Sequence, residues 1–196
     1  RCAAAVGGGG VEANSVFLRH NARVIHCRSR RGGGVFASSL TAEGSAMIAH
    51  CVATDTGGGV YGFSGVIALK GKATIKNCSS AVRGGGVYAE HHLFIAPEAQ
   101  LRVTLSGDSR ITQCRAATGG GLFLYSETAV RMSARATIDD CHATDKGGGM
   151  YVHPGGAAFC QDAAALAGCS SQRGGGMYMS AGTAVTIRDN VIITGC

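Results

Sequence analysis

Cysteine is the residue type with reactive chemistry that this sequence repeats most regularly. Eight of its nine cysteines recur at intervals of 25, 24, 27, 36, 27, 28 and 27 residues. They are Cys2, Cys27, Cys51, Cys78, Cys114, Cys141, Cys169 and Cys196. Zinc sites use paired ligands at short spacing, whereas the smallest gap between cysteines here is nine residues, from Cys160 to Cys169. We therefore predict no metal site and no cofactor.

Two roles for these eight cysteines, which we call the cysteine ladder, remain open. Stacked parallel strands place equivalent residues about 4.8 Å apart, which lies within the Cα separations that a disulfide accepts. Equivalent Cβ atoms point the same way, so a disulfide between neighbours requires local tilting. Buried cysteine also packs as a small apolar residue. A ladder of buried free thiols and a ladder with at least one disulfide are both consistent with the sequence.

Acidic residues that could support catalysis gather in one place. Asp139, Asp140 and His142 lie together, with Asp162 one repeat later, and paired carboxylates can act as general acid and base in glycoside cleavage. Asp139 and Asp140 are neighbours, however, so on a strand they face opposite sides. The equivalent residues one repeat earlier are Thr112 and Gln113. We therefore predict no catalytic residues and no enzymatic activity.

Basic and aromatic residues recur at fixed positions. The formal net charge is +6, and in four of seven repeats the residue before a glycine run is basic: Arg31, Arg83, Lys146 and Arg173. This basic stripe is suited to an acidic glycan or another polyanion, or it is simply a solvated corner; we expect no nucleic-acid partner. An aromatic residue follows the first aliphatic residue after six glycine runs: Phe36, Tyr61, Tyr88, Phe123, Tyr151 and Tyr178. These rings form either a binding strip or a stack that only stabilises the fold.

All these residues belong to one repeated unit, and self-similarity at a fixed period indicates a solenoid. An aliphatic residue precedes each cysteine by three positions from Val24 to Ile193, and a glycine run follows each of the first seven cysteines. Glycine tolerates positive φ and close backbone approach, so we assign Gly34, Gly59, Gly86, Gly121, Gly149 and Gly176 to sharp corners. A phosphate-binding loop is excluded because such loops need a following helix, and here a strand pattern follows.

The elements that position these residues are predicted to be strands. Apolar and polar residues alternate, as in Leu40, Ala42, Ala46 and Ile48, and a period of two indicates strands with one buried face. Each repeat holds about three short strands. We predict an all-β, right-handed parallel β-helix of about seven coils, with residues 1–196 forming a single domain, because parallel crossovers are right-handed by default.

One coil is longer than its neighbours. Residues 79–114 exceed the usual length by about nine, and the pattern resumes in register afterwards. We expect the extra segment, near residues 90–105, to project outward, as insertions in solenoids do. No run of about 18 apolar residues suggests a membrane span.

The two ends also suggest an expectation about context. The sequence opens and closes on ladder cysteines without the polar terminal repeats that usually cap solenoids. We expect either a section of a longer solenoid or a unit whose ends stack on identical units.

The repeat resembles a known family. Its pattern of Ile-x-x-Cys-x-Ala, then Gly-Gly-Gly-Val-Tyr, is similar to the repeats of chlamydia-type polymorphic outer-membrane proteins over essentially all of the chain. An aliphatic residue such as Ile75 or Ile138 replaces the phenylalanine of those repeats, and cysteine replaces their asparagine. The resemblance implies a right-handed β-helix of the broader pectin-lyase-like class and a structural or adhesive role at the cell surface or outside the cell. Partners would then be surface proteins or acidic glycans, and a carbohydrate-active or polyanion-binding module is the alternative.

Overall fold

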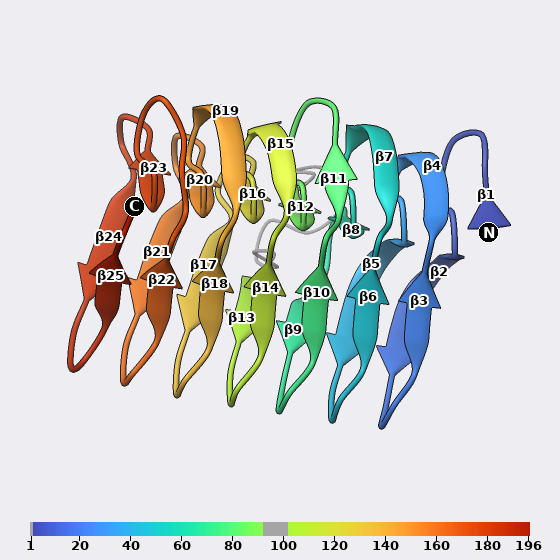
Figure 1. The fold of residues 1–196 in the computed structure, drawn as a ribbon, viewed down its shortest axis with the longest axis horizontal. Coiled ribbons are helices and arrows are strands. Elements are labelled where there is room, and N and C mark those ends of the chain that lie inside the picture. The colour runs from blue at the N-terminus through green and yellow to red at the C-terminus, as the bar shows by residue number, and fades with distance from the viewer. Residues whose placement is uncertain (1, 92–101) are drawn as a thin grey trace.

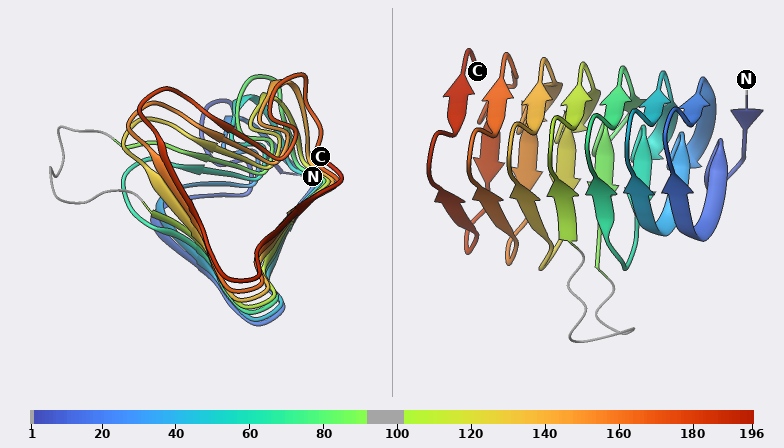
Figure 2. Two further views of the ribbon diagram at one scale, coloured as in Figure 1. Left: turned by 90° about the vertical axis from the view of Figure 1, so that its left-hand side faces the viewer. Right: turned by 90° about the horizontal axis from the view of Figure 1, so that it is seen from below.

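The computed structural model describes residues 2–91 and 102–196. Within them the chain forms 25 β-strands and no helix, stacked as a parallel β-solenoid of about seven coils (Figure 1). In that view the chain rises on the near side, returns on the far side and advances from right to left. The winding is therefore right-handed, as predicted. Figure 2 shows the coils in cross-section, one behind another.

Three sheets run along the solenoid, and every strand pair in them is parallel. The sheet that leads into the cysteines comprises β3 (Arg23–Ile25), β6 (Met47–Ala49), β10 (Thr74–Lys76), β14 (Arg110–Thr112), β18 (Thr137–Asp139), β22 (Ala165–Ala167) and β25 (Ile192–Thr194). The sheet that begins at or just after the cysteines comprises β1 (Cys2–Ala3), β4 (Cys27–Arg31), β7 (Val52–Thr56), β11 (Ser79–Ser80), β15 (Arg115–Thr118) and β19 (His142–Lys146).

The third and largest sheet follows the glycine runs. It begins with two long strands, β2 (Val11–Leu18) and β5 (Val35–Ala42). In later coils each long strand is replaced by a pair. The first members are β8 (Val60–Gly62), β12 (Val87–Ala89), β16 (Leu122–Leu124), β20 (Met150–Val152) and β23 (Met177–Met179). The second members are β9 (Ile67–Leu69), β13 (Arg102–Leu105), β17 (Ala129–Met132), β21 (Ala157–Cys160) and β24 (Ala184–Ile187).

The strand after each cysteine was not among the three expected per coil. In β4 the burial alternates from Cys27 to Arg30, with Cys27 and Ser29 buried. Arginine and serine fill this strand, so its sequence lacks the aliphatic alternation by which the other strands were recognised. Counted from one ladder cysteine to the next, the four middle coils have four strands each, whereas the first two coils and the last have three.

Equivalent aliphatic residues stack in register inside the solenoid. Ile75 aligns with Ile48 on one side and with Ile111 on the other, and Ile138 continues the same column. Each of the four is at most 1 % exposed. One continuous core results, built mainly from aliphatic and small side chains, and its burial is the main source of stability. Cys160 aligns with Met132 and Ile187 and is buried, so the ninth cysteine is a core residue.

The long coil keeps its register on both sides of the insertion. β12 pairs with β8 and β16, and β13 pairs with β9 and β17. Most of the segment predicted to project outward, near residues 90–105, lies outside the described residues. The resumption of the repeat after the insertion is confirmed.

Replacing Ile138 with aspartate is expected to lower the free energy of unfolding by at least about 3 kcal/mol, because a carboxylate would be buried without a partner. Val82→Asp is the matched control, since Val82 is 41 % exposed on the side of the solenoid. Urea denaturation of both variants measures the difference. Equal stabilities would contradict the inward orientation of Ile138.

Candidate functional site

The cysteine ladder lies in the wall of the solenoid, at the corner between the first two sheets. Cys27, Cys51, Cys78, Cys114, Cys141 and Cys169 are buried, and only the terminal members Cys2 and Cys196 are exposed. Successive corners are joined by backbone hydrogen bonds; the amide of Arg115, for example, donates to the carbonyl oxygen of Cys78. The ladder is thus part of the core.

Seven of the eight ladder thiols, from Cys27 to Cys196, have a local hydrogen-bond acceptor. Sγ of Cys51 lies 3.3 Å from the carbonyl oxygen of Ala49, and Sγ of Cys141 lies 3.3 Å from that of Asp139. The same bond, from a cysteine to the carbonyl oxygen two residues earlier, occurs at Cys27, Cys78, Cys114, Cys169 and Cys196. A cysteine at this corner is small enough to be buried. Its thiol also donates a hydrogen bond to a carbonyl group that the bend directs toward it.

The bend itself comes from the residue before the cysteine, which sequence reasoning missed. In every coil from the second cysteine onward this residue has a positive φ, between 50° and 63°: His26, His50, Asn77, Gln113, Asp140, Gly168 and Gly195. Asn, Asp, His and Gly are the residues most often found in this region. The recurrence of such residues directly before each cysteine was the available signal.

The cysteines are free thiols in this structure, nine in all. Burial raises the pKa of the Cys160 thiol to about 11, and burial also raises the pKa of Cys114. A buried thiol with a raised pKa forms little thiolate, which is the species that reacts with oxidants and metals. For Cys114 and Cys160, burial and the raised pKa together favour packing over reactivity.

The six glycines predicted at corners lie between two strands of each coil, but none of them has a positive φ. The left-handed residue is the first glycine of each of the last six runs: Gly32, Gly57, Gly84, Gly119, Gly147 and Gly174. A Cβ atom on Gly121, one of the predicted set, would lie 2.6 Å from the carbonyl oxygen of Gly149 and 2.8 Å from Cγ2 of Ile138. The predicted glycines are needed because neighbouring coils approach too closely for a side chain.

The basic stripe forms a column with two threonines. In register along the solenoid stand Arg31, Thr56, Arg83, Thr118, Lys146 and Arg173. Arg31 lies 4.0 Å from Asp55, and Arg173 donates to Asp145 at 2.7 Å. Much of the positive charge of this column is therefore neutralised locally.

The remaining contacts of the basic stripe are with aromatic rings of the next coil. The guanidinium carbon of Arg31 lies 5.8 Å from the ring centre of Tyr61, and that of Arg83 lies 5.5 Å from Phe123. Nζ of Lys146 lies 5.3 Å from the ring of Tyr178. Cations over ring faces at these distances are attracted by the ring quadrupole.

The aromatic residues form a stacked column on the outer side of β5, β8, β12, β16, β20 and β23. Tyr61 and Tyr88 stack with ring centres 5.0 Å apart, and Phe123 and Tyr151 stack at 4.7 Å. The central rings of Tyr61, Tyr88 and Phe123 are at most 4 % exposed. Their faces are occupied by one another, so the column acts first as a second, outer apolar cluster.

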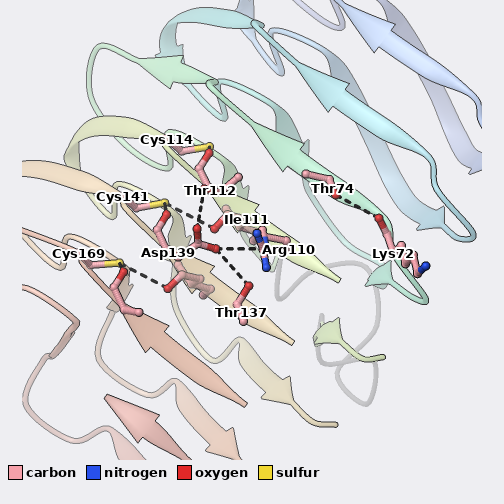
Figure 3. A network of polar contacts seen from close by, with 12 residues as sticks. Lys72, Thr74, Arg110, Ile111, Thr112, Cys114, Thr137, Asp139, Cys141 and Cys169 are labelled. Carbon is pink, nitrogen blue, oxygen red and sulfur yellow. Dashed lines mark hydrogen bonds and ion pairs between the residues drawn. The ribbon is translucent and has the colours of Figure 1, made fainter. Parts of the chain in front are cut away.

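The acidic candidates do not converge. Asp139 lies on β18 and accepts hydrogen bonds from Thr112 at 2.8 Å and Thr137 at 3.1 Å (Figure 3). It also pairs with Arg110 at 3.6 Å. Asp140 forms the left-handed corner, and the ring Nδ1 of His142 lies 2.9 Å from Oγ of Ser170.

Asp162 belongs to a different corner of the solenoid. Its carboxylate accepts a hydrogen bond from the backbone amide of Ala134 at 2.8 Å. Within residues 2–91 and 102–196, no three His, Cys, Asp or Glu side chains are arranged to hold a metal ion. The same part of the chain contains no helix long and apolar enough to cross a membrane.

Fold and site together define a class of protein, the parallel β-solenoid with a buried cysteine ladder. In comparisons with known proteins, no family model, curated protein or solved structure matches the chain.

Replacing Gly121 with alanine is expected to cost several-fold more stability than replacing Gly182. The new methyl group at Gly121 would collide with the backbone of the next coil, whereas a Cβ on Gly182 would meet nothing within 4 Å. Gly182 also has a positive φ of 73°, so its alanine variant should lose about 1 kcal/mol from backbone strain. Denaturation midpoints measure both, and equal losses would contradict the close-approach explanation.

Thiol accessibility is expected to divide the nine cysteines into two groups. Under native conditions a maleimide should label Cys2 and Cys196 rapidly, because only these two are exposed. In denaturant without reductant, all nine should be labelled. Intact mass spectrometry counts the labels, and fewer than nine in denaturant would reveal a disulfide within the ladder.

Proposed function

We propose that this chain is a structural or adhesive β-solenoid that works at the cell surface or outside the cell. The observation that carries the proposal is the in-register stacking of equivalent side chains from coil to coil, such as Ile48, Ile75, Ile111 and Ile138. In the last coil of the 196 residues, the side chains that continue these columns are partly exposed: Val185 is 47 % exposed, Ile187 50 % and Ile193 45 %. An exposed core cross-section with unpaired strand edges favours continued strand pairing.

The partners that fit such a surface are further coils of the same chain or identical units stacked end to end. A head-to-tail contact with only a small rotation between units does not close into a ring, so stacked identical units would extend the solenoid into a filament. The resemblance of the repeats to chlamydia-type polymorphic outer-membrane proteins supports a surface role and adhesion to surface proteins.

An enzymatic role has less support. Asp139 is held by Thr112, Thr137 and Arg110, and the interior thiols are buried. Polyanion binding by the basic stripe also has less support, because Asp55 and Asp145 pair with Arg31 and Arg173. Carbohydrate binding remains the alternative role, since it depends on a polar cavity rather than on free positive charge.

End-to-end association is tested with Ile187→Lys, which places a charge on the exposed end of the core. The 196-residue chain is expected to self-associate as its concentration rises, and this variant should weaken association at least tenfold. Val82→Lys adds the same charge to the side of the solenoid, where Val82 is 41 % exposed, and should have little effect.

Analytical ultracentrifugation over a hundredfold concentration range measures both variants. A chain that stays monomeric over this range, or an equal effect of the two substitutions, would overturn the stacking part of the proposal.

A further inference from the structure

A cavity of about 260 Å³ opens on the outer surface beside the aromatic column. Two arginines of the basic stripe, Arg31 and Arg83, line it together with Thr56, Asp55 and Glu90. Three tyrosines, Tyr61, Tyr88 and Tyr125, complete its lining. Its size lies near the lower end of ligand pockets, about 300–1,000 Å³, so a small group of a larger ligand fits it better than a whole drug-sized molecule.

The first sign of a ligand is an unpartnered hydroxyl group. Thr56 is only 6 % exposed, and its Oγ1 is buried without a hydrogen-bond partner. A buried polar group without a partner costs about 1–3 kcal/mol. Because Thr56 lines the cavity, a group that enters from solvent can supply the missing hydrogen bond.

The second sign is a guanidinium group beside that hydroxyl. Arg83 stands next to Thr56 in register, one coil further along. Its side chain lies over the ring of Phe123, and no carboxylate within the described residues forms an ion pair with it. Stacking holds the guanidinium plane against the ring, and one side of the guanidinium interacts with the phenol of Tyr88. Its remaining N–H donors are available at the cavity.

The carboxylates of the cavity are held in place by other side chains. Glu90 accepts hydrogen bonds from the phenol groups of Tyr61 and Tyr88, the second at 3.0 Å. Asp55 lies 3.8 Å from Arg30 and 4.0 Å from Arg31. Burial, with the Glu90 carboxylate beside them, raises the pKa of both phenols, so they remain hydrogen-bond donors at any physiological pH.

This set of groups selects among ligand charges. An anion would meet the carboxylates of Asp55 and Glu90, and a cation would meet the guanidinium groups of Arg31 and Arg83. A neutral ligand with several hydroxyl groups avoids both repulsions, because each hydroxyl donates to a carboxylate and accepts from an arginine or from Thr56. The ring of Tyr125, which is only half-buried, adds apolar surface against which a sugar ring can pack.

We propose that this cavity, centred on Thr56 and Arg83, binds one sugar unit of a neutral glycan. The inference adds a ligand to the adhesive role proposed above and rests on that role for its biological meaning. Its test is separate, since saccharide binding to a monomer does not require end-to-end association.

Ligand-observed NMR with maltose, cellobiose, lactose and mannobiose tests the inference, with digalacturonate and a sulfated heparin disaccharide as anionic comparators. At least one neutral disaccharide is expected to bind the native chain with a millimolar dissociation constant, more tightly than either anionic comparator. Thr56→Val and Arg83→Gln should each weaken that binding about fivefold or more, the effect of losing a hydrogen bond of about 1 kcal/mol.

Two matched substitutions in the same column act as controls. Thr118→Val and Lys146→Gln change equivalent residues of later coils that do not line the cavity, and both should leave binding unchanged. Thr56→Val should also leave the denaturation midpoint unchanged or raised, because it removes an unpartnered buried hydroxyl.

Three results would overturn the inference. They are no binding of any neutral disaccharide at 20 mM, preference for the anionic comparators, and equal loss of binding in the Thr118 and Lys146 controls. A failed titration alongside concentration-dependent sedimentation would refute the sugar site and leave the structural role standing.

Discussion

The close stacking of one coil on the next at the glycine corner is the constraint on which the rest of the structure depends. There the third glycine of the run leaves no room for a Cβ atom in four coils, because the backbone oxygen of the next coil, an isoleucine methyl group and a ladder sulfur atom surround it. These glycines are Gly34, Gly59, Gly86 and Gly121. Backbone hydrogen bonds pass through the same point, from the amide of Gly86 to the carbonyl oxygen of Gly121, for example. A coil that carried a side chain here would be pushed off the axis, and every column beyond it would lose its register.

The repeat explains how much of this architecture could be predicted. Equivalent spacing in the sequence becomes equivalent position in space once strands pair in parallel, so the columns of Ile138 and Cys141 and the stacked rings around Tyr88 followed from residue numbers alone. The sequence offered positive φ and close approach as two reasons for the corner glycines. Positive φ belongs to Gly119, and close approach belongs to Gly121. That distinction depends on backbone geometry between coils, which a one-dimensional pattern does not contain.

Two features escaped prediction for different physical reasons. The left-handed residue before each ladder cysteine from Cys27 onward varies among histidine, asparagine, glutamine, aspartate and glycine. Because the residue type changes from coil to coil, the shared positive φ is hard to recognise in the sequence. Two of the three partners of Asp139, Thr112 and Arg110, come from a neighbouring coil, and Thr112 is 27 residues away. Both the conformation and the contact arise from stacking and leave only a weak trace in the local sequence.

The same reasoning indicates where a solenoid can carry function. Positions that repeat in every coil satisfy packing, and their side chains contact copies of themselves; the rings of Tyr61 and Tyr88 are an example. Recognition requires groups that differ from coil to coil, and these occur where the repeat is broken. Thr56 stands in a column shared with arginine and lysine, and Glu90 belongs to the longer coil. Because the stacked scaffold holds such exceptions rigidly against one another, a few departures from the repeat are enough to form a polar cavity on an otherwise uniform surface.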